Sequence, residues 1–271
     1  FFVAWIGALS YSMQIYFDFS GYSDMAIGVS RLLGIDLPIN FNSPYKAKNI
    51  VDFWRRWHIT LSRFLRDYLY VPLGGNRRGK IRRYANLLVT MLLGGIWHGA
   101  GWTFIIWGAL HGLAQSLDHA VEELRHTHKF ARLPVAASWL LTMVFVTFAW
   151  VAFRSPTLDT SVSMWRGMFG FSGFAVPSID IFARLAHVFG VQPVGFGISS
   201  LLTLLLAIFL ALAAPNSQEL LHIYSPGLDS PKYNAVGREA SAWLSLGSNW
   251  KTVLFVGMLL GLSLRAIGGY S

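Results

Sequence analysis

Long uncharged stretches recur along the chain and determine its predicted architecture. Four of them contain no Asp, Glu, Lys or Arg and approach or reach the roughly 20 residues that a helix needs to cross a bilayer, namely residues 1–17, 84–117, 135–153 and 194–214. A fifth, residues 250–267, has Lys251 and Arg265 near its ends, where long side chains can extend to the membrane interface. Backbone groups in lipid must bond to one another, so these stretches are expected to be helices. The pattern predicts an all-α fold, a polytopic transmembrane helix bundle.

The stretch 84–117 is too long for a single crossing, and glycines interrupt it on both sides of His98. We predict two helical pieces, residues 85–97 and 102–117, joined by a broken or re-entrant segment. Non-helical backbone at membrane depth is tolerated only where protein or a water-filled cavity surrounds it. The break is therefore the first candidate for a functional site.

The segment 51–70 has a different pattern, in which apolar and basic side chains take opposite sides of a helix. At about 100° per residue, the apolar side holds Phe53, Trp54, Trp57, Leu61, Phe64, Leu65 and Tyr68. The opposite side holds Arg55, Arg63 and Arg66. This pattern predicts an interfacial amphipathic helix, with its aromatic rings toward lipid or protein and its guanidinium groups toward water or phosphate. His58 lies just beyond the edge of the apolar side, and the residues 72–76 that follow are typical of a turn.

The charges of the chain are few and clustered. Only 13% of the residues are charged and 54% are hydrophobic, which favours a lipid-facing surface over a soluble one. The net charge is +9, and eleven of the 22 Lys and Arg residues lie between Lys46 and Arg83. A basic cluster between apolar spans is typical of a cytoplasmic loop that lies near anionic lipid, and it argues against nucleic-acid binding.

Two further features limit the chemistry and the extent of the chain. It contains no cysteine, which excludes disulfides, thiolate metal sites and a cysteine nucleophile in this chain. It begins with two phenylalanines and no cleavable signal pattern follows, so we expect it to be a portion of a longer protein.

Two of the eight histidines, His98 and His111, lie inside an uncharged stretch, where an ionisable group is costly and often functional. His98 lies on the glycine-broken segment between Trp97 and Trp102. Away from water its imidazole is expected to be neutral and able to accept a proton, as a general base must. For His111, between two glycines, a structural hydrogen bond to a carbonyl of a neighbouring helix is the favoured interpretation. The others, apart from His58, are expected to be solvated loop residues: His119, His126, His128, His187 and His222.

Several polar residues near the apolar stretches have open alternatives. His58 is equally compatible with an interfacial position and with a place in the site. Asn76 could orient a histidine or a substrate. Asp18 and Asp24 are expected to cap a following helix, with the lining of a polar path as the alternative.

Seven motifs together resemble the membrane-bound O-acyltransferase family, specifically its bacterial branch that acetylates polysaccharides. In the order of the family they are residues 16–24 (YFDFSGYSD), 41–45 (FNSPY), 53–62 (FWRRWHITLS), 64–75 (FLRDYLYVPLGG), 94–102 (GGIWHGAGW), 107–112 (WGALHG) and 148–154 (FAWVAFR). The likeness is greatest to the membrane subunits of alginate O-acetylation. We therefore expect a single membrane-embedded domain over residues 1–271, the carboxy-terminal portion of such a protein. Residues 1–155 would carry the catalytic motifs and residues 156–271 would add further membrane helices.

The resemblance implies helices around a funnel or tunnel, with the family's two histidines, His98 and His58, near its constriction as the catalytic pair. Trp97, Trp102, His111, Asn76 and Asp24 are expected to line the site, and no metal is expected. No cofactor is expected to be tightly bound. The expected donor is acetyl-CoA or another acyl thioester, delivered directly or on an acyl carrier from the cytoplasm.

The expected acceptor is a hydroxyl of an extracytoplasmic polysaccharide such as alginate, reached directly or through a periplasmic acetyltransferase partner. The expected location is the bacterial cytoplasmic (inner) membrane, crossed several times. Two other classes of function stay open. Broken helices with histidines also suit a transporter or channel, and a non-catalytic scaffold could recruit a periplasmic transferase. Haem binding is a weaker alternative, because the spacing of His58 and His98 does not establish facing axial ligands.

Overall fold

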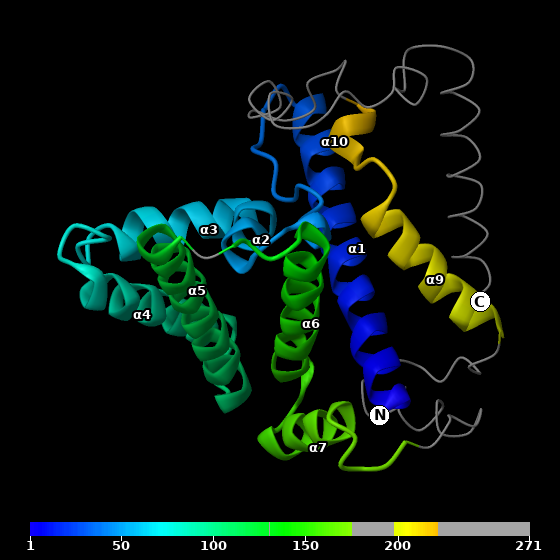
Figure 1. Cartoon of the computed structure of the whole chain (residues 1–271). Helices are drawn as coiled ribbons and strands as arrows, with labels where there is room; N and C mark the ends of the chain where they lie inside the picture. Colours follow the sequence, from blue (N-terminus) through cyan, green and yellow to red (C-terminus); the bar gives the residue numbers. More distant parts are fainter. Residues whose placement is uncertain (130, 175–197, 222–271) are drawn as a thin grey trace. The chain divides into compact units, whose positions relative to one another are not determined.

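The computed structural model describes residues 1–129, 131–174 and 198–221, and in this part of the chain it is all-α, with no β-strand (Figure 1). The helices are α1 (Phe2–Leu32), α2 (Ile50–Arg56), α3 (Ile59–Leu65), α4 (Lys80–His98), α5 (Trp102–His128), α6 (Val135–Arg154), α7 (Leu158–Met168), α9 (Ile198–Leu212) and α10 (Ser217–Leu220). Two short helical turns accompany them, η1 (Pro44–Lys46) and the π-helical η2 (Arg66–Tyr70). The predicted helix 250–267, His187 and His222 lie outside the described residues.

The chain forms two compact units. The first comprises Phe1–Tyr22 and Asn40–Ala214, and the second comprises Ser23–Ile39 and Pro215–Ser271. In the second unit, a capping box between Asn216 and Glu219 starts α10. The cavity and the core described below belong to the first unit.

Helix α1 is longer than the predicted uncharged stretch, because the helix continues through Asp18 and Asp24 to Leu32. Both carboxylates therefore lie inside a helix, and the prediction that they cap the start of a following one was wrong. The aromatic and small residues around them have no helix-breaking proline. The charges interrupt the apolar pattern without interrupting the helix.

The predicted single amphipathic helix over residues 51–70 was also wrong. The structure divides this segment into α2, α3 and η2, with a break at Trp57 and His58. His58 has left-handed backbone angles (φ 42°, ψ 56°), which a residue other than glycine rarely adopts. The apolar side is divided as well: Phe53, Trp54 and Trp57 are buried in protein, whereas Phe64 and Tyr68 are exposed.

Helices α4 and α5 form the hairpin that the glycine pattern predicted, with the break at residues 99–101. Glycines let the two helices approach closely, because a Cβ on Gly95 or Gly108 would collide with a backbone carbonyl of the facing helix. A Cβ on Gly112 would lie 2.8 Å from Leu88 Cα. Further from the break, Lys80 and Arg83 of α4 pair with Glu123 of α5. Close packing at the glycines therefore stabilises the hairpin near the break, and ion pairs stabilise it at the other end.

Helix α5 also continues further than predicted. It ends at His128, so His119, His126 and His128 lie on a helix and not in a connecting loop. Salt bridges from Glu122 to Arg125 and Arg132, and its contact with His126, accompany this polar last part of the helix. A helix can continue beyond an apolar stretch where charged side chains three and four residues apart support it.

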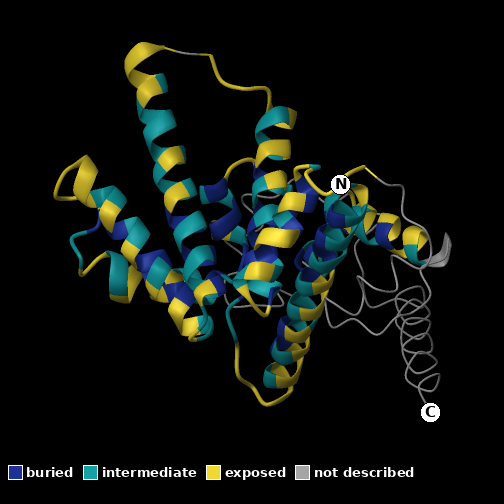
Figure 2. Ribbon diagram, turned by 90° about the horizontal axis from the view of Figure 1, so that it is seen from below, coloured by how far each residue is buried: buried dark blue, intermediate teal, exposed yellow. Residues whose placement is uncertain are grey.

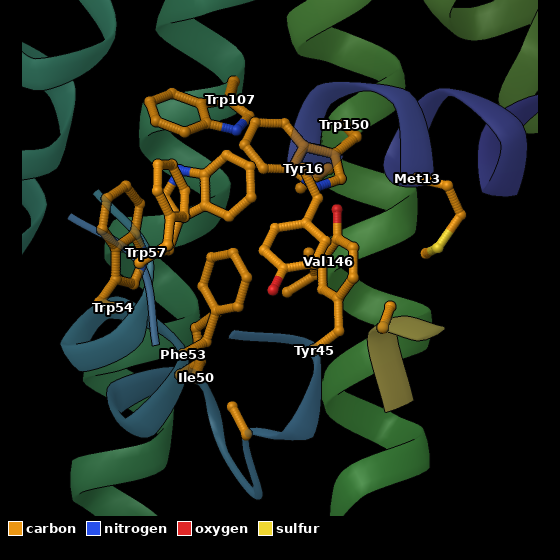
Figure 3. Close-up of a cluster of buried hydrophobic side chains, with 14 of the residues drawn as sticks. Met13, Tyr16, Tyr45, Ile50, Phe53, Trp54, Trp57, Trp107, Val146 and Trp150 are labelled. Carbon is orange, nitrogen blue, oxygen red and sulfur yellow. The ribbon is translucent and has the colours of Figure 1, made fainter. Parts of the chain in front are cut away.

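The core of the first unit is aromatic. Helices α1, α2, α5 and α6 and the turn η1 contribute its large rings: Tyr16, Tyr45, Phe53, Trp54, Trp57, Trp107 and Trp150. Figure 3 shows these rings gathered against one another, and the Trp57 and Trp150 ring centroids lie 4.9 Å apart. The Tyr45 hydroxyl donates a hydrogen bond of 2.5 Å to the Ser12 carbonyl. The buried polar end of this tyrosine is thereby satisfied.

Large apolar side chains are exposed along several helices, as a lipid-facing surface requires. Figure 2 marks the exposed positions of the helices in yellow. On α9 they include Leu202, Leu205 and Phe209. Among the described helices, α6 is the one that is long and apolar enough to cross a membrane by length and composition. The all-α fold is thus observed, whereas the bundle of several spans stays a prediction.

Candidate functional site

A cavity of about 550 Å³ lies in the first unit, along one side of α1. Its lining residues are Tyr11, Gln14, Ile15, Asp18, Phe19, His58, Trp97, His98 and Phe153. They come from α1, the break between α2 and α3, the end of α4 and the end of α6. The cavity brings together His58, Trp97 and His98, which the sequence singled out, and Asp18, for which the lining of a polar path was the alternative.

His98 is the last residue of α4, and aromatic rings hold its imidazole. The centroids of Trp97, Trp107 and Phe153 lie 4.9, 5.3 and 5.0 Å from its centroid, each in an edge-to-face arrangement. Phe104 stacks on it at 6.4 Å, and a Cβ on Gly99 would lie 2.6 Å from the Phe104 ring. The glycine after the histidine is therefore needed for the close approach of this ring. Packing fixes the imidazole, and within the described residues no hydrogen bond engages its nitrogens.

His58 is held differently, by hydrogen bonds. Its Nδ1 lies 3.0 Å from Asn40 Oδ1. The Asn40 carbonyl accepts a hydrogen bond of 2.9 Å from the Ile59 backbone N–H, so Asn40 supports the backbone turn at His58 as well. The Phe19 ring packs edge-to-face on the imidazole at 4.8 Å. Burial, and to a smaller extent the nearby His98, lowers the pKa of His58 to about 4, which keeps the ring neutral at physiological pH.

Three polar side chains of α1 form another wall of the cavity. Tyr11, Gln14 and Asp18 follow one another at intervals of three and four residues, so they share one face of the helix. The Arg154 guanidinium lies 5.7 Å from the centre of the Tyr11 ring. Sequence reasoning missed Tyr11 and Gln14, and it gave the lining of a polar path only as the alternative for Asp18. The helical spacing of these polar residues within an apolar stretch is the signal that could have identified them.

His111 lies outside this lining and is fully buried. The Trp54 indole N–H donates a hydrogen bond of 3.2 Å to its Nδ1. The Trp107 ring packs against both histidines. Its centroid lies 4.9 Å from the ring centroid of His111 and 5.3 Å from that of His98. His111 therefore supports the aromatic residues behind the site, but its observed partner is the Trp54 indole and not the helix carbonyl that was expected.

The other predicted site residues do not line the cavity. Trp102 is the first residue of α5 and is 69% exposed. Asn76 is exposed in the turn between η2 and α4. Asp24 belongs to the second unit, where the Gln218 amide donates a hydrogen bond of 3.3 Å to its carboxylate.

Comparison with known proteins matches residues 1–156, which include every element that lines the cavity, to the membrane-bound O-acyltransferase family. The chain belongs to this family. The match ends close to the last of the seven motifs, and it includes both cavity histidines, in the RWH and WHG motifs of this membrane-bound O-acyltransferase.

Curated relatives place the chain among bacterial members of the family. It is 55% identical over 176 residues to a peptidoglycan O-acetyltransferase of Helicobacter pylori, covering 65% of this chain and 33% of the relative. It is 40% identical over 264 residues to a probable alginate O-acetylase AlgI of Pseudomonas putida, covering 97% of this chain and 50% of the relative. A teichoic acid D-alanyltransferase of Bacillus subtilis is 35% identical over 151 residues, with 53% and 38% covered. The chain thus spans about a third to a half of the length of these relatives.

Proposed function

We propose that this chain forms the catalytic part of a bacterial O-acyltransferase that moves an acetyl group from a thioester to a hydroxyl of a cell-surface polysaccharide. One observation carries the proposal: the histidines of the RWH and WHG motifs, His58 and His98, line a single cavity. Two neutral imidazoles beside one space can handle the proton of an attacking hydroxyl, which acyl transfer requires. The relatives named for the acetylation of alginate and of peptidoglycan support an acetyl group and a polysaccharide acceptor.

In the proposed reaction, the acceptor oxygen attacks the thioester carbonyl carbon while its proton passes to a ring nitrogen of His98. The tetrahedral intermediate then collapses and the carbon–sulfur bond breaks. The leaving sulfur takes the proton back from the imidazolium. The products are an ester and a free thiol, and His98 ends the cycle neutral. His58 orients the attacking hydroxyl.

The donor is proposed to be acetyl-CoA or another acyl thioester that arrives from the cytoplasm. Exposed basic side chains in the turn before α4 and in the first residues of this helix support an anionic donor or an acidic carrier: Arg77, Arg78, Lys80 and Arg82. Lys80 is already paired with Glu123. The arginines of the turn are therefore the stronger candidates for binding the phosphates of CoA. Attraction to anionic lipid is a second duty that the same charges can serve.

The acceptor side is proposed to be extracytoplasmic, with the acyl group passing to the polymer directly or through a periplasmic transferase. The enzyme is proposed to cross the bacterial inner membrane several times. The exposed apolar side chains of the described helices and the apolar length of α6 support this location.

The test is the transfer of labelled acetyl from acetyl-CoA in membranes that contain the full-length protein. A positioned general base contributes roughly 10²- to 10⁴-fold to a rate, so His98→Ala should lower transfer by about 100-fold or more while the protein still inserts into the membrane. His126→Ala is the matched control, since the His126 side chain is 76% exposed on the polar end of α5. That variant should retain the rate of the unmodified protein.

Other outcomes would decide for other functions. Labelled transfer at an unchanged rate in His98→Ala would exclude His98 as the base and favour a scaffold. Ion flux through reconstituted vesicles, without any transfer of acetyl, would favour a transporter.

A further inference from the structure

The side-chain oxygen of Asn40 accepts several hydrogen bonds at the break between α2 and α3. It lies 3.0 Å from His58 Nδ1, 3.0 Å from Thr60 Oγ1 and 3.3 Å from the Thr60 backbone nitrogen. Residue 40 precedes the break by 18 positions in sequence, so this contact exists only through the tertiary fold. Nothing in the sequence marked Asn40 as part of the site.

The Thr60 backbone N–H fixes which way the Asn40 amide faces. A backbone N–H can only donate, so the atom that it meets must be an acceptor, the amide oxygen and not the amide nitrogen. The Thr60 hydroxyl donates to the same oxygen. The orientation of the amide therefore follows from the backbone and does not depend on the state of the histidine.

The orientation of the amide in turn fixes the tautomer of His58. An amide oxygen has no proton to donate, and an unprotonated ring nitrogen 3.0 Å away would set two lone pairs against each other. His58 Nδ1 therefore carries the proton and donates it to Asn40. In a neutral imidazole the other nitrogen, Nε2, is then an acceptor. Within the described part of the chain, Nε2 has no hydrogen-bond partner, and the ring is one of those that line the cavity.

We propose that Asn40 is a positioning residue, which holds His58 as the Nδ1–H tautomer so that Nε2 accepts a hydrogen bond from a hydroxyl of the acceptor sugar next to the one that reacts. This inference rests on the proposed function and specifies the role of His58 in the proposed reaction. A neutral His58 in this tautomer has no proton to offer to a thioester carbonyl from Nε2. It positions the nucleophile: it holds a neighbouring hydroxyl of the sugar, and the reacting hydroxyl is left to give its proton to His98.

The tautomer can be read without any reaction. The full-length protein is labelled with ¹⁵N-histidine, and the signal of His58 is identified by its loss in His58→Asn. The two ring nitrogens of a neutral imidazole have widely separated ¹⁵N shifts, according to which one carries the proton. At pH 7 we expect Nδ1 to be protonated and Nε2 to be unprotonated. A protonated Nε2, or an even mixture of the two tautomers, would overturn the proposal.

Three variants separate positioning from mere support of the fold. Asn40→Ala should convert His58 to a mixture of tautomers, and Asn40→Asp, which keeps an acceptor oxygen, should restore the Nδ1–H form. Thr60→Val removes the Thr60 hydroxyl, which contacts Asn40 Oδ1 at 3.0 Å and His58 Nδ1 at 3.5 Å, but it leaves the bond between Asn40 and His58 and should keep that form too. If Asn40→Ala does not fold, the comparison of Asn40→Asp with Thr60→Val and the spectrum of the unmodified protein still decide the assignment.

The kinetic part of the experiment connects the tautomer to the reaction. Loss of the partner that orients a metal-ligating histidine typically costs about 10- to 100-fold in activity, and we expect a loss of the same order for His58. Asn40→Ala should therefore lower kcat for acetyl transfer by that factor with little change in KM for acetyl-CoA, and Asn40→Asp should recover most of the loss. An unchanged kcat in Asn40→Ala would overturn the positioning role. If the unmodified protein transfers no acyl group, the proposed function fails, while the ¹⁵N spectrum still tests the tautomer.

Discussion

The two cavity histidines are held by different physical means. His98 follows an uninterrupted helix and is surrounded by aromatic rings, which restrict its orientation without engaging its nitrogens. His58 is in a left-handed backbone conformation, which costs an L-residue about 1–2 kcal/mol, and hydrogen bonds from the adjacent residues to Asn40 offset this cost. Backbone strain is thus located beside the cavity, where it sets the direction of a side chain.

The lowered pKa of His58 predicts how acid affects the stability of the protein. In the unfolded chain His58 takes up a proton near its ordinary pKa of about 6.5, whereas in the folded protein it does so only near pH 4. Between these values the unfolded state binds more protons, so stability falls as the pH is lowered from about 6.5 toward 4. His58→Asn, whose side chain tolerates the left-handed conformation, lacks this dependence.

The measurement is the thermal midpoint of the purified full-length protein at pH 7 and pH 5. Between pH 7 and pH 5, the thermal midpoint of the unmodified protein should fall further than the midpoint of His58→Asn. Equal losses in the two proteins would show that His58 does not remain neutral when buried.

At the scale of elements, two interruptions of helices create the site, and they have different origins. Glycines cause the break at residues 99–101: Gly99 ends α4 and leaves room for the Phe104 ring. The break at Trp57 and His58 has no glycine or proline. It depends on Asn40 and on the Arg56 carbonyl, which accepts a hydrogen bond of 2.9 Å from the Asn42 N–H. Local sequence therefore explains the first break and tertiary contacts explain the second.

The close packing of α4 and α5 gives a prediction for Gly108. A Cβ at this position would collide with the Met91 carbonyl, and backbone atoms cannot move aside as a flexible side chain can. Gly108→Ala should therefore lower the thermal midpoint of the full-length protein by several degrees, because overpacking costs about 1–3 kcal/mol. This exceeds the gain of about 1 kcal/mol in helix propensity.

Gly28→Ala is the matched control for this prediction. Gly28 lies within α1, and a Cβ there would have no atom of the described residues within 4 Å. It should leave the midpoint unchanged or raise it. A midpoint in Gly108→Ala as high as that of Gly28→Ala would contradict the close approach of the two helices.

At the scale of the whole molecule, the basic turn between η2 and α4 predicts how the chain is oriented in the membrane. Lys and Arg in short loops remain on the cytoplasmic side, and the turn carries the exposed Arg77 and Arg78 next to Asn76. This chain has no cysteine, so a single Asn76→Cys substitution gives it one labelling site.

Asn76→Cys should react with a membrane-impermeant maleimide in inside-out vesicles and not in intact spheroplasts. Cysteines elsewhere in the full-length protein are replaced by serine beforehand, and the protein without any cysteine is the control. Labelling in intact spheroplasts would place the turn on the outer side and contradict a cytoplasmic anionic donor at this turn.

The sequence by itself determined the elements whose signals are local. Uncharged length identified α6, and glycines identified the hairpin of α4 and α5 with His98 at its break. The seven motifs identified the family. Apolar length, glycine spacing and motif order are properties of adjacent residues, which a chain carries before it folds.

Only the tertiary structure decided which polar residues meet. The same helical periodicity runs through residues 51–70 whether or not the helix is broken, so the break at His58 could not be read from it. Asn40, Gln14 and Asp18 join the histidines because distant segments pack around one aromatic core. Hydrogen bonds and cavities form between surfaces that the fold brings together, and their partners are therefore fixed by packing and not by neighbouring sequence.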